Sequence, residues 1–230
     1  MKKAVVSIFL VLTLTISGCA SKDKEQNINE TSKNETTLET IDVSTADGAL
    51  ERLKSGNEAF VKGKSEMINI SKDRREDLEK GQNPFAIVVS CSDSRVTPAH
   101  VFDTGLGDIF EIRLAGNVVD ELALGSIEYG VEHLGSPLLL VMGHENCGAV
   151  TATYNCVKDN KEDTSNIGRI VEEIKPSVLE SKDIEEASHK NVEAVIKKIE
   201  EDPSIKKFID EGKLKIVVAY YNLNGEVTFN

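Results

Sequence analysis

Two apolar runs that end just before a cysteine or a histidine constrain the fold of this chain more than any other feature. Residues 85–89 (Phe-Ala-Ile-Val-Val) lead to Cys91, and residues 138–142 (Leu-Leu-Leu-Val-Met) lead to His144 and Cys147. Apolar, β-branched runs of this length are typical of buried strands in parallel sheets. The carboxyl ends of such strands lie at one edge of the sheet, where ligands bind. We therefore expect the three side chains to meet there.

The sequence predicts that these three residues form a zinc site. Two thiolates and an imidazole suit tetrahedral zinc, and three protein ligands leave a fourth position for water, as in catalytic sites. Asp93 is placed to accept a hydrogen bond from that water, and Arg95 to hold the carboxylate ionised and oriented. Two alternatives stay open. A cysteine after a strand is commonly a small core residue, and cysteines close enough to share a metal are also close enough to form a disulfide.

The rest of the pattern predicts an α/β fold. Strand-like and helical segments alternate, which indicates a mainly parallel central sheet flanked by helices. Further strands are expected at residues 109–113 and 214–220, with a short final strand after the turn at 224–225. Helices are expected from Thr45 to about residue 61, at 71–80, from Pro98, at 120–134, from Gly148, at 166–179, at 183–201 and from Pro203.

The first residues have the pattern of an export signal. Lys2 and Lys3 precede an apolar run at residues 4–16, which is shorter than the roughly 20 residues that span a bilayer. The sequence Ile-Ser-Gly-Cys that ends at Cys19 is similar to a bacterial lipobox. We therefore expect residues 1–18 to be a lipoprotein signal peptide and lipidated Cys19 to anchor the exported protein to the outer face of the cell membrane. An ordinary cleaved signal with an incidental cysteine is the alternative.

Composition separates a linker from a folded domain. Residues 19–44 are almost entirely polar, so they cannot bury enough apolar surface to fold, and we expect a flexible linker. Residues 45–230 are enough for one domain with a sizeable core. The net charge of −12 argues against binding to nucleic acid or to anionic lipid. Contact with a membrane is therefore expected only through the lipid anchor.

The sequence around the three candidate ligands resembles the β-class carbonic anhydrases. The resemblance lies in residues 91–95 (CSDSR), 105–110 (GLGDIF), 115–118 (AGNV), 126–129 (SIEY) and 143–150 (GHENCGAV), in this order. It implies a β-carbonic anhydrase-like domain over residues 45–230 with an N-terminal helical arm. It also implies one zinc ion per chain and the reversible hydration of carbon dioxide to bicarbonate and a proton.

The resemblance also assigns roles to residues. Zinc is bound by Cys91, His144 and Cys147, and Asp93 and Arg95 are the catalytic pair.

Further positions match substrate-binding residues of the family, namely Gln82, Phe110, Tyr129 and Gly148. In the family, Phe110 and Tyr129 correspond to residues that line the pocket of the neighbouring subunit. The resemblance therefore implies a homodimer or a higher even oligomer. The first helix reaches over the partner subunit in that family, although its periodicity equally fits packing on its own core.

Several readings stay open within this resemblance. The same fold and ligands serve hydrolysis of carbonyl sulfide or carbon disulfide, and a zinc-binding module without turnover is a further alternative. In one subgroup of the family the aspartate itself binds zinc. Cys156 is expected to be a free thiol, because it is too far along the helix from Cys147 to bridge it. His100, His133 and His189 lack partner spacing and are expected at or near the surface.

Overall fold

In the computed structural model, the two apolar runs form neighbouring parallel strands. These strands, β1 (Ala86–Cys91) and β3 (Leu138–His144), are buried at every position, as expected for strands covered on both faces. Both continue beyond the apolar runs that predicted them. As a result, Cys91 and His144 are the last residues of their strands rather than part of the loops that follow.

The structure describes residues 41–66, 68–161 and 164–230, all of them within one compact unit, Thr36–Asn230. The predicted signal peptide, the lipidation site Cys19 and nearly all of the predicted linker lie outside these residues. Within them, no helix is long and apolar enough to cross a membrane.

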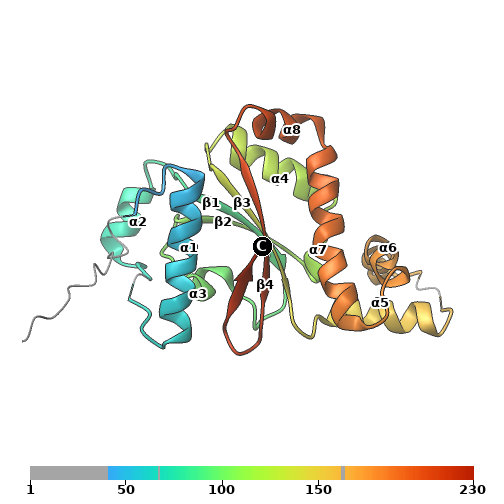
Figure 1. Cartoon of the computed structure of the whole chain (residues 1–230). Coiled ribbons are helices and arrows are strands. Elements are labelled where there is room, and N and C mark those ends of the chain that lie inside the picture. The colour runs from blue at the N-terminus through green and yellow to red at the C-terminus, as the bar shows by residue number, and fades with distance from the viewer. Residues whose placement is uncertain (1–40, 67, 162–163) are drawn as a thin grey trace, which may run out of the picture. The chain divides into compact units, whose positions relative to one another are not determined.

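The described residues form one sheet of five strands in the order β2-β1-β3-β4-β5 (Figure 1). The further strands are β2 (Ile109–Leu114), β4 (Lys215–Tyr221) and β5 (Val227–Phe229). Only β5 is antiparallel to its neighbour, so the predicted mainly parallel sheet is confirmed. Cys91 lies opposite Leu114, and His144 lies opposite Tyr221. The carboxyl ends of the four parallel strands therefore lie along one edge of the sheet.

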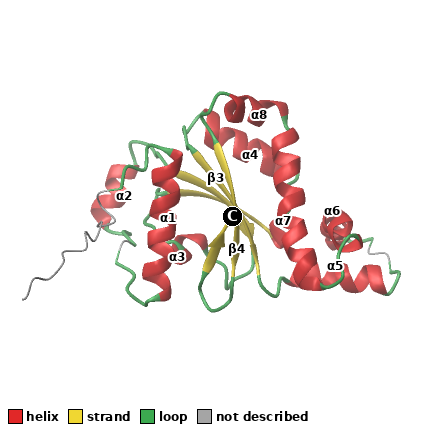
Figure 2. Cartoon of the chain, in the orientation of Figure 1, coloured by secondary structure: helices red, strands yellow, loops and turns green. Residues whose placement is uncertain are grey.

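Helices cover both faces of this sheet (Figure 2). On one side lie α1 (Ala46–Val61), α2 (Lys72–Leu78) and α3 (Pro98–Val101), and on the other α4 (Glu121–Glu132), α7 (Ile184–Glu201) and α8 (Pro203–Asp210). The remaining helices, α5 (Gly148–Lys158) and α6 (Asn166–Leu179), pack against each other and against α7. The predicted α/β class with flanking helices is confirmed.

Helix α1 packs against its own sheet. Thr45 caps it by accepting a hydrogen bond from the Gly48 amide at 3.1 Å, and Ala49 and Leu53 are fully buried in the core cluster that includes β1 and β3. The carboxamide of Asn57 donates to the backbone oxygens of Val101, at the end of α3, and of Gly225, in the turn before β5. The described contacts thus show packing on its own core, and a role of α1 at a subunit contact stays a prediction.

A tight turn follows β2 and lies beside the metal ligands. Gly116 and Asn117 adopt positive φ angles of 70° and 46°. A side chain at Gly116 would lie 2.6 Å from Ile174 Cδ1 and 3.0 Å from Ala149 Cβ, so only glycine fits without a shift of its neighbours. The turn brings the backbone close to Cys91, which packs in the apolar cluster that α5 and α6 complete.

Candidate metal centre

The carboxyl ends of β1 and β3 bring together the three side chains that the sequence predicts as metal ligands. The sulfurs of Cys91 and Cys147 and a ring nitrogen of His144 lie within 4.8 Å of one another. Cys147 is the residue directly before α5, which it caps. The three side chains are almost completely buried, with exposed fractions of 5%, 1% and 1% for Cys91, Cys147 and His144. Two sulfurs and an imidazole at this spacing suit zinc.

The ring of His144 presents a free nitrogen. Its Nδ1 lies 2.9 Å from the backbone oxygen of Glu145, and because a carbonyl oxygen only accepts, Nδ1 carries the proton. Nε2 is buried without a hydrogen-bond partner among the described residues. An unpaired buried polar atom costs about 1–3 kcal/mol, and a metal ligand is a common reason to keep one. This observation is independent of the sequence motif and supports the fit to a metal ion.

Cys91 and Cys147 shift each other's pKa in opposite directions. The Cys147 thiol donates to the Cys91 sulfur, and this contact lowers the pKa of Cys91 to about 4 against the opposing effect of burial. The same contact raises the pKa of Cys147, and burial raises it further. A divalent cation held at this position would favour both sulfurs as thiolates.

Asp93 and Arg95 form a second group beside the ligands. The guanidinium and backbone amide of Arg95 donate three hydrogen bonds to the Asp93 carboxylate, and these bonds hold the pKa of Asp93 well below its usual range. Arg95 Nη2 also lies 3.4 Å from the backbone oxygen of Asn146, in the loop that carries Cys147. Asp93 is not in the group of converging ligand atoms. Its carboxylate faces Arg95, as the predicted catalytic pair requires.

Two residues near the ligands were not found by sequence reasoning. Arg113 on β2 donates to the backbone oxygens of Cys91, Asp93 and Val96 at 3.2, 2.8 and 2.8 Å, which fixes the loop after β1. Asn191 on α7 donates to the backbone oxygen of Gly116 at 2.8 Å. The sequence feature that could have indicated Arg113 is its charge, because it lies inside a predicted strand.

Gly148 lies where the prediction places it, directly after Cys147 and at the start of α5. It is exposed, and nothing lies within 4 Å of the position that a side chain would occupy. The space beside this backbone is therefore open to a small ligand, next to the helix N-terminus, which favours negative charge.

The other predicted substrate-binding residues lie elsewhere in the same chain. Phe110 is the second residue of β2, four residues before the position opposite Cys91, or about 13 Å along the strand. The ring of Tyr129 on α4 lies 6.2 Å from the Phe110 ring, and the residue is 46% exposed. Gln82 is exposed in the loop before β1, at the opposite end of that strand from Cys91. Within one chain these three residues do not join the metal centre.

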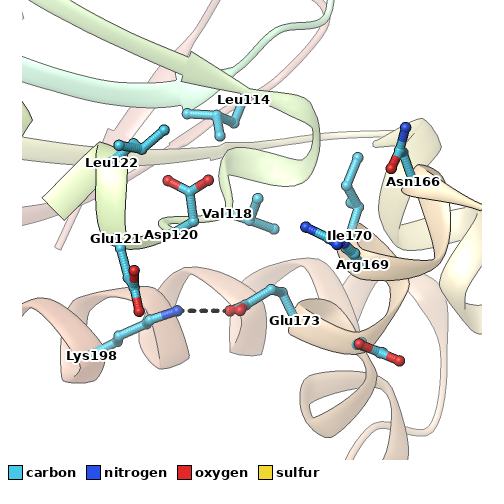
Figure 3. Close-up of a pocket in the computed structure, with 11 residues that line it drawn as sticks. Leu114, Val118, Asp120, Glu121, Leu122, Asn166, Arg169, Ile170, Glu173 and Lys198 are labelled. Atoms are coloured by element: carbon cyan, nitrogen blue, oxygen red, sulfur yellow. Dashed lines mark hydrogen bonds and ion pairs between the residues drawn. The ribbon is translucent and has the colours of Figure 1, made fainter.

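A separate hollow opens between β2, α4, α6 and α7 (Figure 3). It has a volume of about 720 Å³ and contains the ion pair between Lys198 and Glu173, whose charged atoms lie 2.9 Å apart. Its walls include Leu114, Val118 and Asp120 but none of the predicted site residues. This hollow is therefore distinct from the metal centre.

Comparison with known proteins agrees with this site. A sequence model of the family described as carbonic anhydrase matches residues 86–227. "Carbonic anhydrase 2" of Mycobacterium tuberculosis is 39% identical over 182 residues, which cover 76% of this chain and 88% of that protein. The solved β-carbonic anhydrase CcaA is 26% identical, with a TM-score of 0.61 over 79% of this chain and 87% of its own. Tetrameric β-carbonic anhydrases of Sordaria macrospora share the fold at 22% identity, with a TM-score of 0.63 and coverage of 79% and 96%.

Proposed function

The chain belongs to the β class of the carbonic anhydrase family, and from this membership we propose how its residues carry out the reaction. The protein is an enzyme that uses zinc to hydrate carbon dioxide reversibly to bicarbonate and a proton. The observation that carries the assignment is the convergence of Cys91, His144 and Cys147 within 4.8 Å. Beside them, Arg95 donates hydrogen bonds to both carboxylate oxygens of Asp93.

Each group near the metal has a separate task. Cys91, His144 and Cys147 would hold the zinc ion, which would supply a Lewis acid that makes water a nucleophile near neutral pH. Arg95 keeps Asp93 ionised, so the Asp93 carboxylate accepts a hydrogen bond from the attacking water and orients it. The Gly148 amide, at the start of α5, is placed to hold an oxygen of the substrate or of bicarbonate. Arg113 fixes the loop that carries Asp93.

The direct test is stopped-flow hydration of carbon dioxide by zinc-loaded protein, with carbonyl sulfide as a second substrate. The wild type should hydrate carbon dioxide, and Cys91→Ser should bind less zinc and lose turnover. Cys156→Ser is the matched control, because Cys156 is a free cysteine outside the metal centre. Zinc-loaded wild type that leaves carbon dioxide unchanged but hydrolyses carbonyl sulfide would contradict the assignment of substrate.

We further propose that two copies of the chain build each active site. The metal centre lies at the carboxyl ends of the strands, whereas Gln82, Phe110 and Tyr129 gather toward the other end. Strand β2, which carries Phe110, is an edge strand, and on the adjacent α4 Leu122 and Tyr129 are 82% and 46% exposed. An edge strand with exposed apolar neighbours is a surface that a second subunit covers. A homodimer brings these residues of one subunit to the metal of the other.

Mixed dimers test this arrangement. Asp93→Ala and Gln82→Ala each impair turnover when present in both subunits. If a site combines Asp93 of one subunit with Gln82 of the other, a dimer of the two variants contains one intact site, and activity returns on mixing. If both residues act within one chain, every site keeps one defect and mixing restores nothing. The control is a mixture of Asp93→Ala with Arg95→Ala. It should stay inactive because the same subunit supplies both residues to a site, so every site keeps one defect.

We also propose that the protein is exported and anchored through Cys19. What supports this is the sequence before residue 20, with Lys2 and Lys3, the apolar run and the lipobox-like Ile-Ser-Gly-Cys. The full chain expressed in a bacterium should incorporate radioactive fatty acid and fractionate with membranes. Cys19→Ser should lose the label and leave the membrane fraction, whereas Cys156→Ser should behave as wild type. An unlabelled wild-type chain recovered from the cytosol would contradict the proposal.

A further inference from the structure

A buried carboxamide on α7 contacts the backbone that surrounds the metal ligand Cys91. Asn191 is 2% exposed, and its Nδ2 donates to the backbone oxygen of Gly116 at 2.8 Å. It lies among apolar residues on the buried face of the helix, where Val192 and Val195 pack into the core. A polar side chain in such a place is kept when its hydrogen bond is needed.

Gly116 is the residue through which Asn191 reaches the metal centre. The Gly116 amide donates to the Cys91 sulfur at 3.2 Å, while its carbonyl accepts from Asn191. Gly116 has the positive φ of 70° described above, and glycine has the widest conformational freedom of any residue. A directional hydrogen bond to its carbonyl restricts the rotation that would turn its amide away from the sulfur.

The amide contact matters for the chemistry of the sulfur. An N–H group that donates to a thiolate withdraws part of its negative charge, so the thiolate donates less charge to a bound metal. A second donor, the Asp93 amide, lies 3.4 Å from the same sulfur. The Gly116 contact is the shorter one, and its geometry depends on a helix that is distant in sequence.

We propose that Asn191 is a positioning residue for Cys91, acting through Gly116. It touches neither substrate nor metal. It holds the turn after β2 so that the Gly116 amide keeps its hydrogen bond to the Cys91 thiolate, which sets the position and the charge donation of that ligand. Groups that orient metal ligands in this way are worth about 10- to 100-fold in metal affinity or activity. This inference rests on the zinc site described above.

Asn191→Leu tests the inference because it removes the donor and keeps the number and branching of the side-chain heavy atoms. The matched control is Asn57→Leu, the same change at a buried asparagine on α1, on the opposite face of the sheet from α7 (Figure 1). Asn57 donates to the backbone oxygens of Val101 and Gly225 and accepts from the Val227 amide. Zinc affinity is measured by competition with a chelator. The bonding of the sulfur is measured by the sulfur-to-cobalt charge-transfer band of the cobalt-substituted protein. Asn191→Leu should lose about 10- to 100-fold in zinc affinity and shift the band, and Asn57→Leu should change neither.

Several results would overturn the inference. One is a folded Asn191→Leu with wild-type zinc affinity and an unshifted band. Another is an equal effect of Asn57→Leu, because the loss would then reflect stability alone. A wild type that binds no zinc would remove the metal site and the inference with it.

A second measurement is available if Asn191→Leu does not fold. In cadmium-113-substituted wild type, the Gly116 amide proton should couple to the metal through the hydrogen-bonded sulfur. The coupling should weaken in the smaller variant Asn191→Ser. Absence of the coupling in wild type, or its full retention in Asn191→Ser, would overturn the inference.

Discussion

Arg95 binds both carboxylate oxygens of Asp93, with Nε 3.0 Å from Oδ1 and Nη2 2.7 Å from Oδ2. The Arg95 backbone amide adds a third hydrogen bond to Oδ1 at 2.9 Å. A planar guanidinium fixes both the charge and the orientation of a carboxylate, which an ammonium group does not. The pair therefore holds Asp93 ionised and prevents it from turning freely toward the metal ligands.

The first prediction concerns this two-point contact. Arg95→Lys keeps the positive charge but loses the fork, so zinc content should stay at one per chain while kcat falls by about 10- to 100-fold. Arg95→Ala should lose at least as much. Zinc content by elemental analysis and stopped-flow kinetics measure the two quantities.

Arg74→Lys is the control for Arg95→Lys. Arg74 makes an ion pair with Asp108 at 2.9 Å through Nη2 alone, and neither residue is among the metal ligands or their hydrogen-bond partners. This variant should hydrate carbon dioxide at the wild-type rate. Arg95→Lys with unchanged kcat would show that the orientation of Asp93 does not limit the reaction.

The second prediction concerns removal of the metal. With zinc chelated, the adjacent thiols of Cys91 and Cys147 should be oxidised to a disulfide by oxidised glutathione, which takes up two electrons and two protons and becomes two reduced glutathione molecules. Zinc-loaded protein should resist, because both sulfurs are then committed to the metal. Peptide mapping after thiol alkylation identifies the pair, and free Cys156 reports general oxidation. Chelated protein in which Cys91 and Cys147 stay alkylatable would contradict the prediction.

The sequence predicted which three side chains meet at the candidate metal centre, because the pattern that indicates them is local. Each ligand lies at or just beyond the end of an apolar run, and parallel strands must align their carboxyl ends. Only the strand ends differed, since Cys91 and His144 belong to the strands themselves. The helix 166–179 was predicted with the bounds that the structure shows, because its apolar positions recur with helical spacing and a serine precedes it.

Contacts between segments distant in sequence could not be predicted in this way. Asn191 and Gly116 are 75 residues apart, and only the packing of α7 beside the turn after β2 joins them. The sequence feature that could have indicated a role for Asn191 is its place on the apolar face of a predicted helix. In the proposed homodimer, the positions of Gln82 and Phe110 relative to the metal depend on a second subunit, which the pattern of one chain does not specify.

The third prediction concerns the turn at Gly116. An alanine there needs a positive φ and places its Cβ 2.6 Å from Ile174 Cδ1, so Gly116→Ala should lower the free energy of unfolding by about 1–3 kcal/mol. It should also weaken zinc binding, because the amide moves relative to Cys91. Urea unfolding and chelator competition measure the two effects.

Gly125→Ala is the contrasting variant. Gly125 lies within α4, and nothing lies within 4 Å of the position that an alanine Cβ would occupy there, so alanine should raise the free energy of unfolding by about 0.5–1 kcal/mol. Its zinc affinity should match wild type. Equal stability changes for the two glycine variants would show that the turn is not constrained as the structure indicates.

The fourth prediction concerns Tyr220, whose ring stacks on His189 with centroids 3.9 Å apart and packs over Gly143, next to the metal ligand His144. Burial raises the pKa of Tyr220 from 10.0 to about 12, with a smaller opposing effect of Ser188. Since the raised pKa belongs to the folded state, the contribution of the neutral phenol is fully present below pH 10 and is lost as the pH rises toward 12. The loss amounts to about 2–3 kcal/mol in the free energy of unfolding.

Other groups also titrate in this range, so the informative quantity is the difference between wild type and Tyr220→Phe. Phenylalanine keeps the buried ring but has no proton to lose. The free energy of unfolding, measured in urea at pH 9 and pH 11.5, should therefore fall further in wild type than in the variant. Equal losses of the free energy of unfolding in the two proteins would mean that the Tyr220 phenol ionises as readily in the folded chain as in the unfolded one. The burial of Tyr220 beside the metal-bearing strand would then not make stability depend on alkaline pH.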